Sequence, residues 1–330
     1  SHFYLVGIKG VAMTALAQIL TDAGKTVAGC DVADDFVTAE VLTHTNCHID
    51  IGFDHPLPTE VECVIYTAAH QGQANPMVIR AQQDHIPVAS HAEALAFFLN
   101  QKHGIAVCGV GGKSTTSAMI AWILSQVGLR PGYAVGVGRI SGLDRTGVWN
   151  EQSPWFVAEA DEYAIDPAAP QKHEPVIPRF GFMKPQVTVC TNLQYDHPDV
   201  YRDFDHTKKT FAQFFLAIKE RGELVINHDN QDLVELVSSI QPFLDQHEVN
   251  VWSFGEDPAS SLQLLNYSAS AGFTTSDIKY KNKVHQLKLI IPGKFNVFNA
   301  LAALLACEVA GVSIDDSIAA LAEFRSTMRR

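Results

Sequence analysis

The stretch from Cys108 to Thr116 combines the residue types that bind nucleotide phosphates. It reads Cys-Gly-Val-Gly-Gly-Lys-Ser-Thr-Thr, after an apolar run at Gly104–Cys108 that predicts a strand and before a helical pattern that Gly128 ends. Backbone N–H groups of a glycine turn can surround phosphate oxygens, a helix N-terminus adds positive potential, and a lysine adds a full charge. The sequence therefore predicts a site for a nucleoside triphosphate.

This loop departs from the common G-x-x-x-x-G-K-[ST] pattern, because Val107 occupies the first glycine position. The alternative is an ordinary glycine-rich turn with a surface lysine, but strand, glycines, Lys-Ser and helix together favour the phosphate site. The hydroxyl of Ser114 is then placed to bind Mg²⁺. The residues that we expect to contact the nucleotide are Gly109, Gly111, Gly112, Lys113, Ser114 and Thr115.

Two further apolar strands end in residues that could hold a metal ion. Trp155–Ala160 runs into an acidic segment that begins at Glu159, and the strand at 187–192 is followed by Asp196 and His197. Carboxylates at the carboxyl end of a strand beside a phosphate loop are typical Mg²⁺ ligands. An acid-rich surface loop and a structural histidine are the alternatives. We expect Ser114, Glu159 and His197 to share the ion.

A second glycine turn opens the chain, at residues 7–13 between a predicted strand and a predicted helix. Gly7, Gly10 and Met13 are expected to bind a nucleotide diphosphate there, and Asp31 closes the next strand, where a carboxylate often binds a ribose hydroxyl. The G-x-G-x-x-G pattern is broken, since Lys9 and Ala12 occupy two glycine positions. A tight structural turn fits the same residues, and a full NAD fingerprint is absent.

A pair of asparagines follows Pro292-Gly293 near the start of a predicted helix. Asn296 and Asn299 share one face of this helix, so their amides could contact an adenine edge or cap the helix. The spacing alone favours capping.

The alternation of strands and helices predicts an α/β protein with a parallel sheet in each of two domains. The first, residues 1–103, is expected to be Rossmann-like, and Gln101–Gly104 is a plausible linker. The second, residues 104–330, is expected to be a P-loop α/β domain with antiparallel hairpins at 250–292 packed on its main sheet. Predicted strands cover 3–7, 25–31, 61–67, 86–89, 155–160, 187–192 and 223–227, and predicted helices cover 12–23, 76–84, 92–99, 296–310 and 313–324.

Composition limits the function classes. A chain of 330 residues with 47% hydrophobic and 18% charged residues is well cored, and a net charge of −12 argues against general nucleic-acid binding. The cysteines form no C-x-x-C pair, which is typical of reduced thiols in a cytoplasmic protein. We expect no secretion signal before the first strand and no membrane span, because no apolar run approaches ~20 residues.

Taken in order, these motifs resemble those of the Mur ligases of bacterial cell-wall synthesis, and of their alanine-adding members in particular. The resemblance runs from about Phe3 to Arg330. It rests on the glycine turn at 7–13, the phosphate loop at 109–116, Glu-Ala-Asp-Glu at 159–162, the T-N-x-x-x-D-H segment at 191–197 and the P-G-x-x-N-x-x-N segment at 292–299.

The resemblance implies specific roles for these residues. The first turn would hold the diphosphate of UDP-N-acetylmuramate, and the phosphate loop would hold ATP, with Lys113 neutralising the β- and γ-phosphates. Glu159 and His197 would belong to the magnesium site, and Asn296 and Asn299 would contact adenine. It also implies that ATP phosphorylates the lactyl carboxylate and that an amine attacks the acyl phosphate, giving an amide, ADP and phosphate.

Three departures leave the identity of the amine open. Lys9 replaces a usual glycine, Phe295 replaces a usual histidine, and Tyr163 replaces a usual serine. Tyr163 resembles the murein-tripeptide ligases, which attach L-Ala-γ-D-Glu-meso-diaminopimelate to the same sugar nucleotide. Residues 164–184 look like an extension. L-alanine and the tripeptide therefore both remain candidate substrates, and the oligomeric state is not predicted.

The resemblance also implies a third domain that binds the incoming amino acid. The segment from Phe324 to Arg330 resembles the hinge that leads into it, so we expect a shortened chain with little ligase activity. A different class of function, a nucleotide-binding module such as a sensor or a P-loop kinase relative, is the competing hypothesis. Such a module should ignore UDP-N-acetylmuramate.

Overall fold

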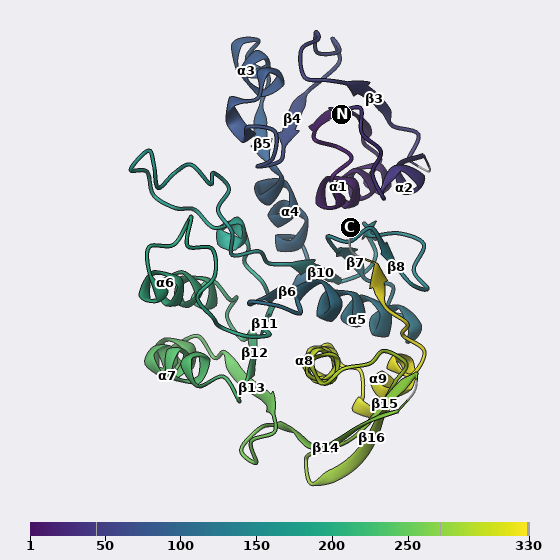
Figure 1. Cartoon of the computed structure of the whole chain (residues 1–330), viewed down its shortest axis with the longest axis vertical. Helices are drawn as coiled ribbons and strands as arrows, with labels where there is room; N and C mark the ends of the chain where they lie inside the picture. Colours follow the sequence, from purple (N-terminus) through teal and green to yellow (C-terminus); the bar gives the residue numbers. More distant parts are fainter. Residues whose placement is uncertain (44, 271, 329–330) are drawn as a thin grey trace.

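The structure is a computed structural model that describes residues 1–43, 45–270 and 272–328. It contains two sheets joined by helices, and Figure 1 shows the smaller N-terminal unit above the larger one. The hinge predicted at 324–330 is described only to Met328, so Arg329 and Arg330 lie outside the described residues. The predicted α/β class is confirmed.

The N-terminal unit is a five-stranded sheet in the order β3-β2-β1-β4-β5, with every neighbouring pair parallel. Parallel neighbours require crossovers, which the helices supply. The strands are β1 (His2–Val6), β2 (Thr26–Asp31), β3 (His48–Ile51), β4 (Cys63–Tyr66) and β5 (Val88–Ser90), and the helices are α1 (Val11–Asp22), α2 (Ala39–Thr43), η1 (Gly72–Ala74), α3 (Pro76–Gln83) and α4 (His91–Asn100).

The larger unit has a ten-stranded sheet in the order β16-β15-β14-β13-β12-β11-β6-β10-β7-β9. Its central strands are parallel, and β6 lies between β11 and β10. The strands are β6 (His103–Cys108), β7 (Gly132–Ala134), β9 (Gly147–Val148), β10 (Trp155–Glu159), β11 (Val187–Cys190), β12 (Glu223–Asn227), β13 (Asn250–Gly255), β14 (Leu262–Ser270), β15 (Phe273–Tyr280) and β16 (Lys283–Leu289).

Helices cover both faces of this sheet, and a two-stranded ribbon pairs β8 (Arg139–Ile140) with β17 (Thr327–Met328). On β6 the side chains alternate, so that Ile105 and Val107 face the core under α5, α8 and α9 while Ala106 and Cys108 face the opposite core. The helices are α5 (Lys113–Gln126), η2 (Arg179–Phe182), α6 (Phe204–Phe215), α7 (Gln231–Gln246), α8 (Lys294–Val309) and α9 (Ile314–Leu321).

The prediction for residues 250–292 was wrong in one respect. The hairpins do not pack on the main sheet but continue it, because β14 pairs in parallel with β13 and then antiparallel with β15. Edge pairing satisfies the backbone groups of β13 that packing on a face would leave exposed. Figure 1 shows this extension as the lower, green part of the sheet.

The two units are joined by a short connection and a shared core. Only Gln101 and Lys102 separate α4 from β6, so the predicted linker at 101–104 is partly strand. Leu16 of α1 and Leu99 of α4 belong to the same apolar cluster as Phe156 of β10. The core therefore runs without a break from one unit to the other.

A buried polar contact fixes α1 to the larger unit. The Gln18 side chain, 2% exposed, accepts hydrogen bonds from Thr146 N (3.2 Å), Thr146 Oγ1 (3.3 Å) and Gly147 N (2.8 Å). Gly147 lies so close to the Ala15 backbone that an added Cβ would overlap it. Nearby, Arg145 pairs with Asp22 at 2.7 Å. These contacts hold the helix that follows the first glycine turn.

No helix among the described residues is long and apolar enough to span a membrane.

We expect Gln18→Leu to lower the free energy of unfolding by about 1–3 kcal/mol, because it keeps the side-chain volume and leaves two buried N–H groups without their acceptor. Chemical denaturation followed by fluorescence measures the change. Gln83→Ala, on the exposed end of α3, is the control and should change stability by less than about 0.5 kcal/mol. An equal decrease in the free energy of unfolding in both variants would show that the Gln18 contact contributes little to the packing of the two units.

Candidate nucleotide and metal site

The phosphate loop joins β6 to α5 in a conformation that needs glycine. Gly109, Gly111 and Gly112 have φ angles of +107°, +82° and +82°. An added Cβ at Gly109 would lie 2.6 Å from Asn192 O, and one at Gly112 would overlap Asn299 Oδ1. Side chains at these two positions are excluded both by backbone strain and by space.

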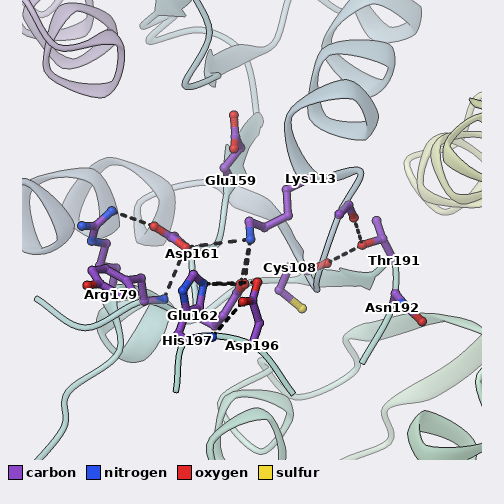
Figure 2. Close-up of polar contacts among 12 residues, drawn as sticks. Cys108, Lys113, Glu159, Asp161, Glu162, Arg179, Thr191, Asn192, Asp196 and His197 are labelled. Atoms are coloured by element: carbon purple, nitrogen blue, oxygen red, sulfur yellow. Dashed lines mark hydrogen bonds and ion pairs between the residues drawn. The ribbon is translucent and has the colours of Figure 1, made fainter. Parts of the chain in front are cut away.

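The neighbouring strand β11 holds the loop from one side. Thr191 Oγ1 donates to Gly111 O at 2.6 Å (Figure 2). Val110 N donates to Asn192 O at 3.0 Å. Thr191 is buried, so its hydroxyl is not exposed to competing water. The T-N part of the predicted segment at 191–197 thus shapes the loop.

Lys113 begins α5 and is paired with an acid. Its Nζ donates to both carboxylate oxygens of Glu162 at 2.9 Å and lies 3.9 Å from Asp161 Oδ1. Burial acts against the charge of Lys113, but the two carboxylates outweigh it and raise its pKa. The lysine is therefore charged. A phosphate that bound Lys113 would compete with the carboxylate of Glu162.

Ser114 and Glu159 meet as the sequence predicted. Ser114 Oγ donates to Glu159 Oε2 at 2.9 Å, and Gly136 N donates to Glu159 Oε1 at 2.6 Å. Burial raises the pKa of Glu159, although both hydrogen bonds and Lys113 favour its ionised form. Thr115 lies beside Ser114 in the first turn of α5, partly exposed.

His197 lies in a second group of ligand atoms. Its Nε2 is 3.6 Å from Glu162 Oε1 and 3.7 Å from Asp196 Oδ2. The hydrogen bond with Glu162 raises the pKa of His197 against the effect of burial. His197 has a φ of +59°, a conformation rare outside glycine. The fold thus holds this side chain at a strained backbone position.

The predicted metal set is therefore divided. In the part of the chain that the structure describes, Glu162, Asp196 and His197 lie within 4.8 Å of one another, and Glu159 is outside that group. Figure 2 shows Glu159 above Lys113 and the His197 group below it. The division arises because Glu159 ends β10 while Glu162 lies three residues further along the chain, beside His197. Hard carboxylate and hydroxyl oxygens suit Mg²⁺, so Ser114 and Glu159 fit this ion.

The asparagines of α8 contact the loop. Asn296 Nδ2 donates to Pro292 O at 2.7 Å, and Asn299 Nδ2 lies 3.4 Å from Asn296 Oδ1. The spacing-based preference for capping was wrong, because Gly293 is the N-cap residue and no side chain caps α8. Gly293 has a φ of +103°, so the turn itself requires a residue without Cβ. Both side chains are buried, and that of Asn299 lies beside Gly112.

The N-terminal turn joins β1 to α1 above a buried carboxylate. Gly7 has a φ of +84°, and Gly10 N donates to Gly7 O at 3.1 Å. Asp31 is fully buried and accepts from Lys9 N at 2.7 Å and from Val32 N at 2.8 Å. Asp31 thus supports the turn from below and is not among the residues that line the cavity.

One cavity of about 630 Å³ connects the two glycine turns. Its walls come from both units: Gly7, Lys9, Gly10 and Met13 from the first turn, Lys113 and Ser114 from the second, and Glu159, Asp161 and Arg179 from the loops after β10. The cavity therefore extends from the predicted diphosphate turn to the first two residues of α5, at the end of the predicted triphosphate loop. Other predicted site residues lie outside its lining: Gly109, Gly111, Gly112, Thr115, His197, Asn296 and Asn299.

Sequence analysis assigned no role to two residues of this site. Glu162 is 2% exposed and contacts both Lys113 and His197, and its position in the acidic run was the available signal. Arg179 enters the cavity from residues 164–184, which the sequence analysis treated as an extension without a role. Nothing in the local pattern marks it.

Comparison with known families identifies the chain. A model described as Mur ligase middle domain matches residues 107–307, and one described as Mur ligase family, catalytic domain, matches residues 2–103. The chain belongs to the Mur ligase family. The predicted membership is confirmed.

Curated relatives carry one name. The UDP-N-acetylmuramate–L-alanine ligase of Carboxydothermus hydrogenoformans is 32% identical over 100% of this chain and 66% of its own length. The enzyme of the same name from Desulfitobacterium hafniense is 30% identical over 100% of this chain and 68% of its own length. The chain thus spans about two thirds of the length of these Mur ligases.

Two solved structures with different names resemble the chain. The UDP-N-acetylmuramate:L-alanyl-γ-D-glutamyl-meso-diaminopimelate ligase of Neisseria meningitidis superposes with a TM-score of 0.82 and 27% identity, over 99% of both chains. The UDP-N-acetylmuramate–alanine ligase of Thermotoga maritima gives a TM-score of 0.80 over 99% of this chain and 69% of its own, and its 23% identity shows the fold alone.

We expect Gly112→Ala to weaken ATP binding by about 10-fold or more, because the new methyl group overlaps Asn299 Oδ1, so that either the Asn299 side chain or the loop must move. Gly128→Ala is the matched control: Gly128 has a φ of +83° at the end of α5, and its Cβ would meet open space. It should share the backbone strain of about 1 kcal/mol without affecting ATP. Titration calorimetry measures the ATP affinity of both variants. Equal affinities would contradict the role of the contact between Gly112 and Asn299 in shaping the loop.

Proposed function

We propose that this chain provides the nucleotide sites of an ATP-dependent ligase of peptidoglycan synthesis, which joins L-alanine to the lactyl carboxylate of UDP-N-acetylmuramate through an acyl phosphate. The observation that carries the proposal is the single cavity that links the N-terminal glycine turn to the phosphate loop. A ligase of this kind must bring a sugar nucleotide and a triphosphate together, which a single nucleotide pocket would not do. The family membership supports the reaction class.

At the ATP end, charge neutralisation is the main task, because two anions must meet in the first step. Lys113 and the N-terminus of α5 would bind the β- and γ-phosphates, and the N–H groups of Gly109, Gly111, Gly112 and Thr115 would surround them. Asn296 and Asn299 would lie on the adenine side. Ser114 and Glu159 would hold Mg²⁺, which neutralises phosphate oxygens when bound, while His197, predicted as a third ligand, lies in the neighbouring group with Glu162 and Asp196.

At the sugar-nucleotide end, Gly7, Gly10 and Met13 would bind the UDP diphosphate at the N-terminus of α1. Asp31, predicted from the sequence to reach a ribose hydroxyl, is committed to the backbone of Lys9 and Val32. We therefore propose that Asp31 contributes to substrate binding by fixing the turn. Residues 1–103 and 104–330 would be the sugar-nucleotide and ATP domains, and six free cysteines support a reducing, cytoplasmic setting.

The tripeptide ligase is the second candidate. Tyr163 donates to Asp199 at 2.7 Å and contacts the His197 ring, so the residue that distinguishes the two enzymes lies at the site. The Neisseria relative, at 27% identity, also favours this reading. Phosphate release with UDP-N-acetylmuramate and ATP, with L-alanine in one arm and the tripeptide in the other, decides between them.

A ligase and a simple nucleotide-binding module differ in the ligands they bind. We expect the chain to bind ATP with Mg²⁺ and UDP-N-acetylmuramate at separate sites, so that saturation with one leaves a titratable site for the other. Calorimetry with each ligand, alone and in the presence of the other, measures this. A chain that bound ATP and ignored the sugar nucleotide would be a sensor or a P-loop kinase relative instead.

We expect Lys113→Ala to abolish detectable ATP binding, a loss of about 100-fold or more, while UDP-N-acetylmuramate binds as before. The lysine supplies the full positive charge at the loop, and charge-assisted hydrogen bonds are the strong ones.

The removal of Lys113 also leaves Glu162 buried without its cation, which could unfold the site. Lys113→Ala combined with Glu162→Gln removes that acid and serves as the second variant. Lys209→Ala, on the exposed face of α6, is the control for loss of a lysine. Unchanged ATP affinity in both Lys113 variants would refute the assigned role.

A further inference from the structure

Arg179 is built into the wall of the cavity by its backbone. It begins η2, and its N–H donates to Tyr163 O at 2.9 Å, while Phe180 N donates to Asp161 O at 3.0 Å. These two bonds tie the end of segment 164–184 to the acidic run that follows β10. The position of the arginine is thus set by the same strand that presents Glu159.

Its side chain is also held in one direction. Arg179 Nη1 donates to Asp161 Oδ2 at 2.7 Å, and the guanidinium lies 5.3 Å from the centre of the Tyr163 ring. The bond to Asp161 uses one of five N–H donors, and the side chain is 33% exposed. Figure 2 shows Arg179 on the far side of Asp161 from Lys113. A preorganised guanidinium with remaining donors therefore faces the cavity.

The neighbours of Arg179 place it between the two glycine turns. On one side, His91 Nε2 donates a hydrogen bond to Ala12 O (3.2 Å), at the start of α1. Burial, and then the charge of Arg179, lower the pKa of His91 to about 4, so this imidazole is neutral near pH 7. On the other side, Asp161 lies 3.9 Å from Lys113 Nζ. Arg179 thus acts on both ends of the cavity.

The other two cations of the lining each make two hydrogen bonds to protein oxygens, whereas the guanidinium of Arg179 makes one and keeps further N–H donors. Lys9 Nζ donates to the backbone oxygens of Val32 (2.7 Å) and Asp34 (3.0 Å), and Lys113 faces Glu162. An anion lying between the diphosphate turn and the phosphate loop would therefore meet Arg179. The reaction proposed above requires an anion there, because the lactyl carboxylate must reach the γ-phosphate from the sugar-nucleotide side.

We propose that Arg179 binds the lactyl carboxylate of UDP-N-acetylmuramate and selects for sugar nucleotides that carry this carboxylate. The inference rests on the proposed function for its substrate. Arginine suits the task because its planar N–H groups match the two oxygens of a carboxylate. Asp161 on one edge and the Tyr163 ring orient the guanidinium without using all of its N–H donors.

A comparison of two ligands tests this assignment. UDP-N-acetylglucosamine has the same uridine, diphosphate and sugar but lacks the lactyl group. We expect Arg179→Ala to weaken binding of UDP-N-acetylmuramate by about 10- to 100-fold, as for a charge-assisted hydrogen bond, and to leave the affinity for UDP-N-acetylglucosamine unchanged. Arg179→Lys, which keeps the charge but not the planar donors, should lose less. Titration calorimetry on the 330-residue chain and its two variants, with each sugar nucleotide, gives all six affinities.

Lys172→Ala is the matched control, since this cation of the same segment is half exposed and pairs with Asp166 outside the cavity. It should leave both affinities unchanged. ATP binding by each variant verifies that the fold is intact.

Separate outcomes test the two proposals. If wild-type protein binds both sugar nucleotides and Arg179→Ala weakens them equally, or weakens neither, the assignment of Arg179 fails while the proposed function stands. If wild-type protein binds neither, the proposed function itself fails and takes the assignment with it.

Discussion

Three carboxylates lie at and just beyond the end of one strand, and side chains that can carry positive charge, from other elements, pair with two of them, Asp161 and Glu162. Glu159, Asp161 and Glu162 follow β10 into a half-buried space, where unpaired negative charges would be strongly unfavourable. Lys113 comes from α5, Arg179 from η2 and His197 from the loop after β11. Elements far apart in the sequence thus converge here for an electrostatic reason as well as a packing reason. Each ion pair also orients a side chain that could bind a ligand.

The same balance explains why the phosphate loop is rigid while its lysine is paired. The glycines of the loop lie against Asn192 and Asn299, and Thr191 binds its backbone. The side chain of Lys113 instead pairs with another anion of the protein, the carboxylate of Glu162. A triphosphate would take over that role, leaving a buried carboxylate beside His197 where a metal ion could be accommodated.

Local pattern was enough to predict much of this arrangement. Glycine turns, apolar alternation and strand-terminal acids located both glycine turns and the closeness of Ser114 to Glu159, because parallel strands place their carboxyl ends together. Some elements were missed because their sequence pattern is short or interrupted. The strands β7 and β9 and the helix α2 are too short to show a period, and Pro242 interrupts the apolar pattern of α7. Arg179 could not be predicted, since its place depends on backbone pairing with Tyr163. The division of the metal ligands likewise depends on side-chain directions that spacing does not encode.

The buried contact of Gln18 with β9 has a consequence for ligand design. Hydrogen bonds fix α1 to the larger unit, and the two cores are continuous. The distance between the two glycine turns is therefore set by the fold itself. A molecule that joined a diphosphate mimic to a triphosphate mimic through a stiff tether of that span would meet a receptor already shaped for both halves. Its second half would bind at high effective concentration, and little affinity would be lost to rearrangement of the protein.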